Sequence, residues 1–337
     1  MPLVSVIIPC YNEQSTVRLL LEAICRQTLP PRDLEIIIAD GMSTDRTRDE
    51  VTAFQRENPE RMIRLIDNQK RVIPAGLNCA LAAAQGQYII RLDGHSVPAP
   101  DYLERCVEAL QADRGENVGG VWEIRPQGDG LIQRAIAIAA AHPFGVGDAR
   151  YRYTNQAGYV DTVPFGAFRR EVFDQFGVYD ETLLTNEDYE YNARLRQQGG
   201  RVWLDPRIRS TYFARSSIRA LARQYWRYGY WKWRMLRRYP KTLRLRQGVP
   251  PVFVLAVALL LLAAPWLAQA AWLLFAVLLA YSLVLAAGSI PAARKYNDLR
   301  LILAVPLAIA AMHFSWGAGF LASMLSVRAT KSSIGMV

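Results

Sequence analysis

The stretch RLDGHS places an acid and a histidine two residues apart at the end of an apolar run. Asp93 and His95 flank Gly94, and His95 is one of only three histidines in the 337-residue chain. Alternate residues near a strand end face the same side, and a glycine lets a ligand approach closely. A carboxylate oxygen and an imidazole nitrogen suit Mn²⁺, or Mg²⁺ when phosphate oxygens and water complete the shell. The pattern predicts a divalent cation site, with a solvated loop as the alternative.

Two further polar clusters follow short apolar runs. PCYNE begins where the run at 3–8 ends, and ADGMSTD overlaps the end of the run at 34–39. In parallel α/β sheets, ligands bind beyond the carboxyl ends of the strands. We therefore expect the three polar clusters to converge at one edge of one sheet, which we call the ligand rim.

The elements that must position these clusters alternate between strand and helix patterns. The expected strands are 3–8, 34–39, 62–66, 87–92 and 117–126, and the expected helices are 15–27, 45–58, 73–85, 101–111 and 186–200. Such alternation predicts an α/β domain with a mostly parallel sheet and helices on both faces.

The C-terminal part of the chain carries two long uncharged stretches. Residues 247–293 contain no Asp, Glu, Lys or Arg, and neither do residues 301–327. A helix needs about 20 apolar residues to cross a bilayer. The first stretch therefore fits two crossings with a turn near 265–269, and the second fits one.

Charge predicts the orientation of these segments. Residues 201–248 hold 14 Lys or Arg and one acid, in a chain whose net charge is +10. This block adjoins the first apolar segment, and the basic residues of 294–300 lie between the second and third. The positive-inside rule places both groups in the cytoplasm. Three crossings then put Arg328 and Lys331 outside, so a re-entrant third segment stays an alternative.

The basic segment 223–240, RQYWRYGYWKWRMLRRYP, mixes arginines with Trp and Tyr. This composition is typical of an interfacial amphipathic helix that meets anionic lipid head groups or a lipid diphosphate. Because the positive charge is concentrated beside the apolar segments, we do not expect nucleic acid as a partner. The four cysteines lack metal-ligand spacing, so we expect them to be reduced packing residues.

Five motifs together resemble the family 2 glycosyltransferases, which have a GT-A fold. In order they are VSVIIPCYNE, IIIADGMSTDRT, RLDGHS, NEDYEYNARLRQQGG and RQYWRYGYWK. DGMSTD, DGH, PFGVG and QYWRYGYWK look most like the ExoA-type succinoglycan glucosyltransferases of bacterial exopolysaccharide assembly. The resemblance covers about residues 1–250, and the apolar tail fits in kind.

The resemblance implies a donor site at the ligand rim. Pro9, Tyr11 and Glu13 match residues that hold the uridine, Tyr11 by ring contact and Glu13 toward the base or ribose. Asp40 matches the first acid of the family's DDGSTD motif and is expected to contact uracil or ribose, while a glycine replaces the second acid. Further donor-side candidates are Arg71 and Asn78.

Asp93 and His95 match the family's D-x-D motif, with histidine in place of the second acid. The resemblance implies that Asp93 faces the metal and the ribose, and that His95 faces the metal that neutralises the donor diphosphate. A neutral imidazole brings less negative charge than a carboxylate, so the cation should be a stronger Lewis acid. Its binding should weaken in acid as His95 becomes protonated.

NED at 186–188 resembles the acceptor-side acidic motif of the family. The resemblance implies that Asp188 is the base that takes the proton from the attacking hydroxyl. Glu187 beside it is expected to raise the pKa of Asp188 and to lie on the acceptor side. An acidic helix start, stabilised by the helix dipole, explains the same residues without catalysis.

Gln224, Arg227 and Tyr228 resemble the Q-x-x-R-W motif of membrane synthases, with Tyr in place of Trp. The resemblance implies that they lie near the acceptor or the diphosphate. Arg227 is expected to hold the leaving diphosphate with two parallel hydrogen bonds.

Together these features predict an inverting, metal-dependent glycosyltransferase that moves a hexose, with glucose favoured, from a UDP-sugar to a polyprenyl-diphosphate-linked saccharide. The expected cofactor is Mn²⁺ or Mg²⁺, and other exopolysaccharide assembly enzymes are candidate partners. The enzyme alternatives are a polyprenyl-phosphate sugar transferase and a processive polysaccharide synthase. The alternative without catalysis is a membrane-tethered nucleotide-sugar sensor.

The expected location is the bacterial inner membrane, with a cytoplasmic catalytic domain and several membrane crossings. We expect a GT-A domain at 1–215, basic aromatic interfacial helices at 216–248, a membrane domain with about three helices at 249–327 and a tail at 328–337.

Overall fold

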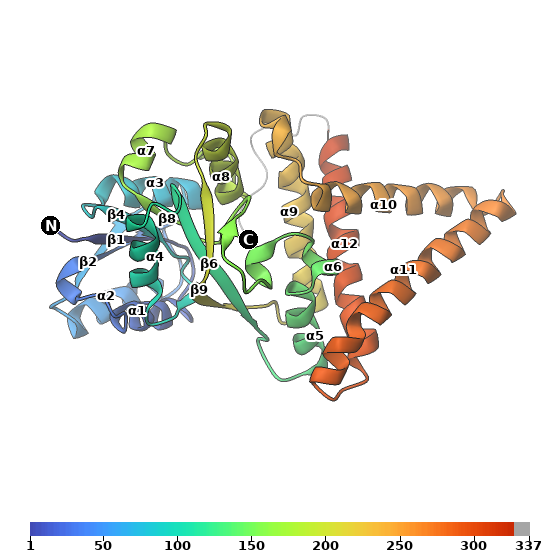
Figure 1. The fold of residues 1–337 in the computed structure, drawn as a ribbon, viewed down its shortest axis with the longest axis horizontal. Helices are drawn as coiled ribbons and strands as arrows, with labels where there is room; N and C mark the ends of the chain where they lie inside the picture. The colour runs from blue at the N-terminus through green and yellow to red at the C-terminus, as the bar shows by residue number, and fades with distance from the viewer. Residues whose placement is uncertain (327–337) are drawn as a thin grey trace. The chain divides into compact units, whose positions relative to one another are not determined.

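The structure is a computed structural model that describes residues 1–326, which form two compact units (Figure 1). Unit 1 contains Met1–Arg125 and Asp148–Phe213, and unit 2 contains Pro126–Gly147 and the described residues from Ala214 onward. Since two segments contribute to each unit, the backbone passes between the units three times. The predicted tail at 328–337 lies outside the described residues.

Unit 1 is built around a nine-stranded sheet. Its strands are β1 (Val4–Cys10), β2 (Leu34–Asp40), β3 (Met62–Asp67), β4 (Tyr88–Arg91), β5 (Val97–Pro98), β6 (Asn117–Arg125), β7 (Gly158–Tyr159), β8 (Ala167–Arg169) and β9 (Val202–Phe213). The order is β3-β2-β1-β4-β8-β6-β9-β5, and β7 pairs with β9. Strands β1 to β4 are parallel, whereas β8 runs antiparallel to both β4 and β6. The predicted mostly parallel α/β sheet is therefore confirmed, and β8 is an antiparallel strand within it.

Helices cover both faces of this sheet. They are α1 (Val17–Cys25), α2 (Thr47–Glu57), α3 (Ile73–Ala83), α4 (Tyr102–Gln111), α7 (Glu171–Phe176) and α8 (Glu187–Gln197), with 3₁₀ turns at Pro31–Asp33 and Arg150–Arg152. Buried residues of α1, α2 and α4 pack on one face, and those of α3, α7 and α8 pack on the other (Figure 1). Because both faces are covered, β1 and β2 are buried along their whole length, which explains their largely apolar sequences.

The parallel strands β1, β2 and β4 end at the same edge of the sheet. In the sheet register, Cys10 pairs with Asp40, and Ile7 pairs with Arg91. The polar clusters that follow these strands are therefore neighbours. The predicted convergence of the three clusters at one ligand rim is confirmed.

Unit 2 consists of helices. They are α5 (Leu131–Ala140), α6 (Pro143–Val146), α9 (Ile218–Arg238), α10 (Leu245–Ala263), α11 (Ala268–Lys295) and α12 (Leu301–Leu325), with a 3₁₀ turn at Pro240–Thr242. By length and composition, α10, α11 and α12 could each cross a membrane. The break between α10 and α11 falls at the predicted turn. The third apolar segment is one continuous helix of 25 residues, long enough for a full crossing.

Helices α9 and α12 pack with their backbones in close contact. A Cβ atom on Gly229 would lie 2.1 Å from the carbonyl oxygen of Trp316, and one on Gly319 would lie 2.3 Å from that of Trp226. Only glycine permits such an approach, as in the small-residue contacts of membrane helices. The aromatic and basic segment of the sequence thus forms a helix that is held along α12.

The α5–α6 segment, which interrupts unit 1 in the sequence, is tied to the C-terminal helices by polar contacts. Arg134 forms an ion pair with Asp298 at 2.9 Å. His142 Nε2 lies 3.1 Å from the carbonyl oxygen of Gly288, and His313 Nε2 lies 2.7 Å from that of Phe144. Two of the three histidines therefore hold unit 2 together.

Candidate active site

The loops that follow β1 and β2 are joined by reciprocal hydrogen bonds. The backbone N–H of Asn12 donates to Ser43 Oγ at 2.9 Å, and the N–H of Thr44 donates back to Asn12 Oδ1 at 2.9 Å. The N–H of Gly41 donates to the carbonyl oxygen of Cys10 at 2.7 Å. These bonds hold the two loops together, and we call this part of the ligand rim, residues 11–13 and 41–45, its floor.

The Tyr11 ring occupies the space next to Gly41. A Cβ atom at position 41 would lie 3.3 Å from Tyr11 Cδ2 and 3.4 Å from the carbonyl oxygen of Cys10. An acid at this position would press against the ring. The ring of Tyr11 therefore packs closely against Gly41.

Asp40 and Pro9 lie beneath this floor. Asp40 is fully buried, and its carboxylate accepts hydrogen bonds from the N–H and hydroxyl of Ser43 and from Arg48. Pro9 is buried within β1, 3.4 Å from where a Cβ of Gly76 would be. In this structure both residues are buried next to the two loops and support them. A direct contact with uridine stays a prediction.

Glu13 and His95 form a pair at the rim. His95 Nδ1 lies 3.0 Å from Glu13 Oε1, and Thr16 Oγ1 donates to Glu13 Oε2 at 2.5 Å. A Cβ on Gly94 would lie 3.0 Å from Glu13 Cγ, so glycine makes room for the pair. Histidines that bind metals usually donate their other ring N–H to a carboxylate. A proton on Nδ1 leaves the lone pair on Nε2, so Glu13 orients His95, and its predicted contact with base or ribose stays a prediction.

Arg91 connects the strand end at Asp93 with the start of α8. Its Nε and Nη2 donate to Asp93 Oδ1 at 3.1 and 3.0 Å, and Nη2 also donates to Glu187 Oε1 at 2.8 Å. The Arg91 side chain is only 4% exposed. The structure thus brings together Asp93 and the predicted acceptor-side acids, which are almost a hundred residues apart in the sequence.

The conformation of Asn186 sets the start of α8. Asn186 has φ 68° and ψ 25°, a left-handed conformation that asparagine tolerates, and its carbonyl oxygen accepts a bond from the N–H of Glu190 at 2.9 Å. The next two residues, Glu187 and Asp188, open the helix. One oxygen of Asp188 accepts the N–H of Tyr189 at 2.7 Å.

Burial and charge together perturb the acids around Arg91. Burial raises the pKa of Glu187 to about 7, against the opposing charge of Arg91 and with a further contribution from Asp188. Burial also raises the pKa of Asp188, and Asp93 adds to this. We predicted a raised pKa for Asp188 with Glu187 as the cause; burial is instead the leading cause. Burial alone would lower the pKa of Arg91, but the surrounding carboxylates raise it well above the ordinary value.

The donor set at the rim fits a divalent cation that also takes oxygens from a substrate. Within residues 1–326, no group of three or more His, Cys, Asp or Glu side chains could hold a metal ion by itself. Asp93 supplies a carboxylate and His95 an oriented imidazole, and the three carboxylates near Arg91 leave the region negatively charged. Oxygen donors and one imidazole are the ligand types that suit Mn²⁺ or Mg²⁺.

The two further donor-side candidates lie on the loop and helix that follow β3. Arg71 is exposed and has φ 57°. Asn78 is used within the protein: its amide nitrogen donates to the carbonyl oxygen of Tyr179 and to Glu181 Oε1, both at 3.0 Å, and its oxygen accepts the N–H of Tyr179. Asn78 therefore holds the segment that leads to α8, and nucleotide contacts of both residues stay predictions.

The remaining candidates belong to unit 2. Gln224, Arg227 and Tyr228 lie on α9, where the amide nitrogen of Gln224 donates to the hydroxyl of Tyr228 at 3.0 Å. Their predicted place near the acceptor or the diphosphate stays a prediction.

Left-handed backbone conformations concentrate at the rim. Five of the seven non-glycine residues with positive φ in the described part of the chain are Asn12, Met42, Arg71, Phe165 and Asn186. The first three follow β1, β2 and β3, Phe165 precedes β8, which pairs with β4, and Asn186 precedes α8. Such conformations cost free energy and cluster at functional sites. The residues with positive φ thus lie near the same edge of the sheet as the predicted site residues.

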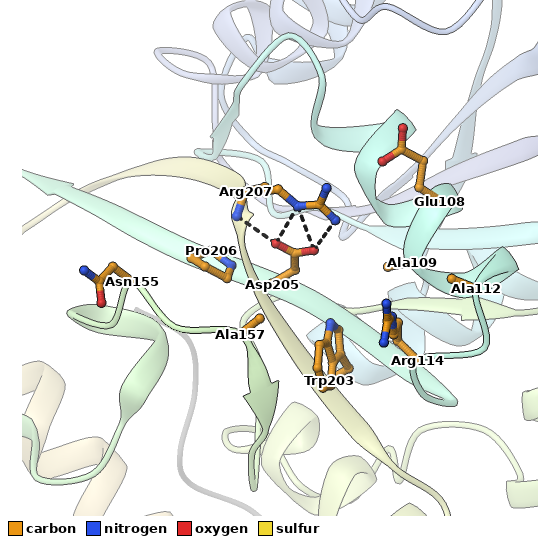
Figure 2. A pocket seen from close by; sticks show the side chains of 10 residues that line it. All are labelled: Glu108, Ala109, Ala112, Arg114, Asn155, Ala157, Trp203, Asp205, Pro206 and Arg207. Atoms are coloured by element: carbon orange, nitrogen blue, oxygen red, sulfur yellow. Dashed lines mark hydrogen bonds and ion pairs between the residues drawn. The ribbon is translucent and has the colours of Figure 1, made fainter.

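A separate pocket in unit 1 contains none of the predicted site residues (Figure 2). It has a volume of about 540 Å³, and Trp203, Arg114 and the Asp205–Arg207 ion pair form part of its wall. Trp203 is in register with Val118 at the beginning of β6. Through Ala167 of β8, this position is also in register with Ile90 of β4.

The fold and this rim define a glycosyltransferase of the GT-A type. The profile described as glycosyl transferase family 2 matches residues 5–177, and the chain belongs to this family. The fold is similar to that of the mannosyltransferase PcManGT from Pyrobaculum calidifontis, solved in complex with GDP-Man and Mn²⁺. That likeness has a TM-score of 0.64 and 21% identity, and covers 92% of this chain and 87% of the other.

Two relatives match across most of the chain. It is 31% identical to the succinoglycan biosynthesis protein ExoA of Rhizobium meliloti (strain 1021), over 96% of this chain and 95% of the relative. It is 28% identical to the dolichyl N-acetyl-alpha-D-glucosaminyl phosphate 3-beta-D-2,3-diacetamido-2,3-dideoxy-beta-D-glucuronosyltransferase of Methanococcus voltae, over 71% of this chain and 75% of the relative. The predicted family, GT-A fold and enzyme class are confirmed.

Sequence reasoning missed the residue at the centre of the site. Arg91 is the single charged residue in the apolar run QYIIRL. A charge inside an otherwise apolar strand is expensive to bury unless it is paired. That contrast was the available signal for Arg91, whereas nothing in the spacing indicated its partner Glu187.

Proposed function

We propose that this enzyme transfers a hexose from a UDP-sugar to a polyprenyl-diphosphate-linked saccharide, with inversion at the anomeric carbon, at the cytoplasmic face of a bacterial inner membrane. The observation that carries the proposal is the junction of Asp93 and Glu187 at Arg91. It joins the strand end expected to bind the donor to the helix start that holds Asp188, the proposed base.

In the proposed reaction, Asp188 takes the proton of the acceptor hydroxyl as its oxygen attacks the anomeric carbon. The bond from that carbon to the diphosphate oxygen breaks on the opposite face, so UDP leaves and the configuration inverts. The raised pKa of Asp188 makes its carboxylate a stronger base. Burial around Glu187 and Asp188 strengthens these electrostatic effects, because little water screens them.

Asp93 and His95 would hold the divalent cation, and Arg227 is our candidate for a further contact with the diphosphate. When bound, the cation would neutralise negative charge on the departing diphosphate. Tyr11, with its ring packed against Gly41, is the candidate for the face of the base. Glu13 keeps His95 oriented through the 3.0 Å contact.

The membrane part of the proposal rests on unit 2 and on relatives. Three helices are long and apolar enough to cross a bilayer, and the basic segment beside them favours the cytoplasmic side. The Methanococcus voltae relative is named for transfer to a dolichyl-linked sugar phosphate, and the Rhizobium meliloti relative for succinoglycan biosynthesis. The first name favours a lipid-linked sugar as the acceptor, and the second favours a role in exopolysaccharide assembly.

A donor screen tests this proposal. The full-length protein in lipid nanodiscs is supplied with UDP-glucose, UDP-galactose or GDP-mannose, with Mn²⁺ or Mg²⁺ and a native lipid extract, and released nucleotide and labelled lipid are measured. We expect UDP release, loss of activity with EDTA and an oligosaccharide lipid. A monosaccharide lipid would favour the polyprenyl-phosphate transferase, and long polymer the processive synthase. Binding of UDP-sugars without turnover under all these conditions would favour the sensor.

A further inference from the structure

A single buried guanidinium holds acids from both halves of the site. Nε and Nη2 of Arg91 donate to Asp93 Oδ1, and Nη2 also donates to Glu187 Oε1. Asp93 lies two residues after the end of β4, on the side expected to bind the donor, whereas Glu187 begins α8 and precedes Asp188 directly. The guanidinium is planar, so its donors keep a fixed mutual geometry. A displacement of either acid is thereby transmitted to the other.

This arrangement is a poor device for stability. The third nitrogen, Nη1, is buried without a hydrogen-bond partner in the described part of the chain, and a buried donor without a partner lowers stability. The carboxylates of Asp93, Glu187 and Asp188 all lie close enough to raise the pKa of Arg91, so they outnumber the single positive charge. Buried ion pairs contribute little net stability even when complete. The position of the acids, rather than stability, explains the arrangement better.

We propose that Arg91 is a positioning residue that couples donor binding to the placement of the acceptor-side base. The proposal rests on the proposed function and names a group that the predicted site did not include. When the donor engages Asp93, the guanidinium fixes Glu187 and thereby the first turn of α8. Asp188 then faces the anomeric carbon in the orientation needed to accept the proton.

The type of side chain is decisive, because Arg91 uses two nitrogens on Asp93 and shares one with Glu187. A lysine ammonium carries a similar charge but has no planar fork. Arg91→Lys therefore keeps the charge and removes the rigid connection. Glu187→Gln keeps the shape of the partner and removes its charge.

A matched control is an arginine on α8, the helix that begins with Glu187. Arg194 Nε donates to Glu190 Oε1 at 2.8 Å, and Glu190 is fully buried. Arg194→Lys therefore also changes an arginine paired with a buried glutamate of α8. None of the predicted contacts to donor or acceptor involves Arg194.

The test is a double-mutant cycle on the full-length protein in nanodiscs. Arg91→Lys, Glu187→Gln and the combined variant are compared for kcat, for the KM of the donor, for UDP binding by calorimetry with MnCl₂ present, and for melting temperature. We expect Arg91→Lys to lower kcat about 10- to 100-fold and to change UDP affinity by a smaller factor. Glu187→Gln should then have little further effect in the Arg91→Lys background. Arg194→Lys should leave kcat and UDP affinity at wild-type values.

Multiplicative effects of the two substitutions on kcat, or equal effects of Arg91→Lys and Arg194→Lys on every readout, would overturn the coupling while leaving the transferase function intact. Failure of the wild-type protein to bind UDP or release it from any donor would instead overturn the proposed function. UDP binding and the melting temperature keep the cycle informative if Arg91→Lys is inactive. A melting temperature lowered by Arg91→Lys together with unchanged kcat would assign Arg91 a purely structural role.

Discussion

The two units place their apolar side chains differently. In unit 1 these side chains lie between the sheet and its helices, as Leu20 of α1 does, with no exposed surface. In unit 2 many face outward: Leu262 of α10 is 67% exposed, and only 11% of the apolar window of α11 is buried, against 39% for α12. Figure 1 shows α10 and α11 diverging from α12 over much of their length. Unit 1 can bury its own core, whereas α10 and α11 require apolar surroundings that the chain does not supply.

The difference also extends to polar groups. Unit 1 buries charged side chains around a predicted reaction centre, and unit 2 uses its two histidines on backbone carbonyl oxygens. The proposed base and cation ligands therefore belong to unit 1, whereas the three helices that could cross a membrane belong to unit 2. Substitutions in each unit can separate the two roles.

The largest effect is expected at the proposed base in unit 1. Asp188→Asn keeps the shape of the side chain but cannot accept the proton, so we expect a loss of activity of about 10²- to 10⁴-fold. UDP binding and the melting temperature should change little. UDP release with a saturating donor and calorimetric UDP binding are the measurements. Unchanged turnover would remove Asp188 from the mechanism.

A second prediction compares two leucines directly. Leu20→Ala creates a cavity in the core of unit 1 and should lower the free energy of unfolding by about 2–5 kcal/mol. Leu262→Ala changes an exposed site on α10 and should alter it by about 0.5 kcal/mol or less. Thermal unfolding of both variants in nanodiscs checks this contrast. Similar losses for both would mean that Leu262 is packed inside the protein.

A third prediction concerns the contact between α9 and α12. Gly229→Ala places a Cβ 2.1 Å from the carbonyl oxygen of Trp316, so the helices must separate, at a cost of about 1–3 kcal/mol. Gly248→Ala on α10 is the control, because the nearest atom, Leu243 Cδ2, lies 3.9 Å away. We expect a lower melting temperature for the first variant alone. Equal melting temperatures would contradict the close helix contact.

A fourth prediction concerns the dependence of stability on pH. The folded protein raises the pKa of Glu187 from 4.5 to about 7, so it binds a proton more tightly than the unfolded chain does. This contribution is present below about pH 4.5 and is lost as pH rises toward 7. The groups that act on Glu187 are Arg91, Asp188 and Asp93. Glu187→Gln should flatten the fall in melting temperature over this range, and an unchanged pH profile would mean that Glu187 does not titrate there.

Sequence periodicity predicted the long elements because each carries a repeated pattern. The runs at 3–8 and 34–39 became β1 and β2, and the uncharged stretches became α10, α11 and α12. Strands β5, β7 and β8 have two or three residues, too few for any pattern, and their pairing depends on distant partners. The antiparallel pairings of these three short strands were not predicted for that reason.

In the candidate site, too, features with a local sequence pattern were predicted, and features that depend on distant partners were not. Residues in short motifs, such as Asp93 and His95, were visible, because their chemistry is local. The pairing of Glu13 with His95 and of Arg91 with Glu187 depends on side chains 82 and 96 residues apart, which no local pattern encodes. Helix α5 was missed because its ten residues, LIQRAIAIAA, are too few to suggest a membrane crossing.

The three passages of the backbone between the units have a practical consequence. A shortened protein that ends after β9 would keep α5 and α6 but lose α12, against which α5 packs, together with Asp298 and Gly288. The exposed apolar side chains of α5 and α6 would then promote aggregation during purification. Anyone who wants the catalytic half alone must also excise residues 126–147 and bridge the gap with a short hydrophilic linker.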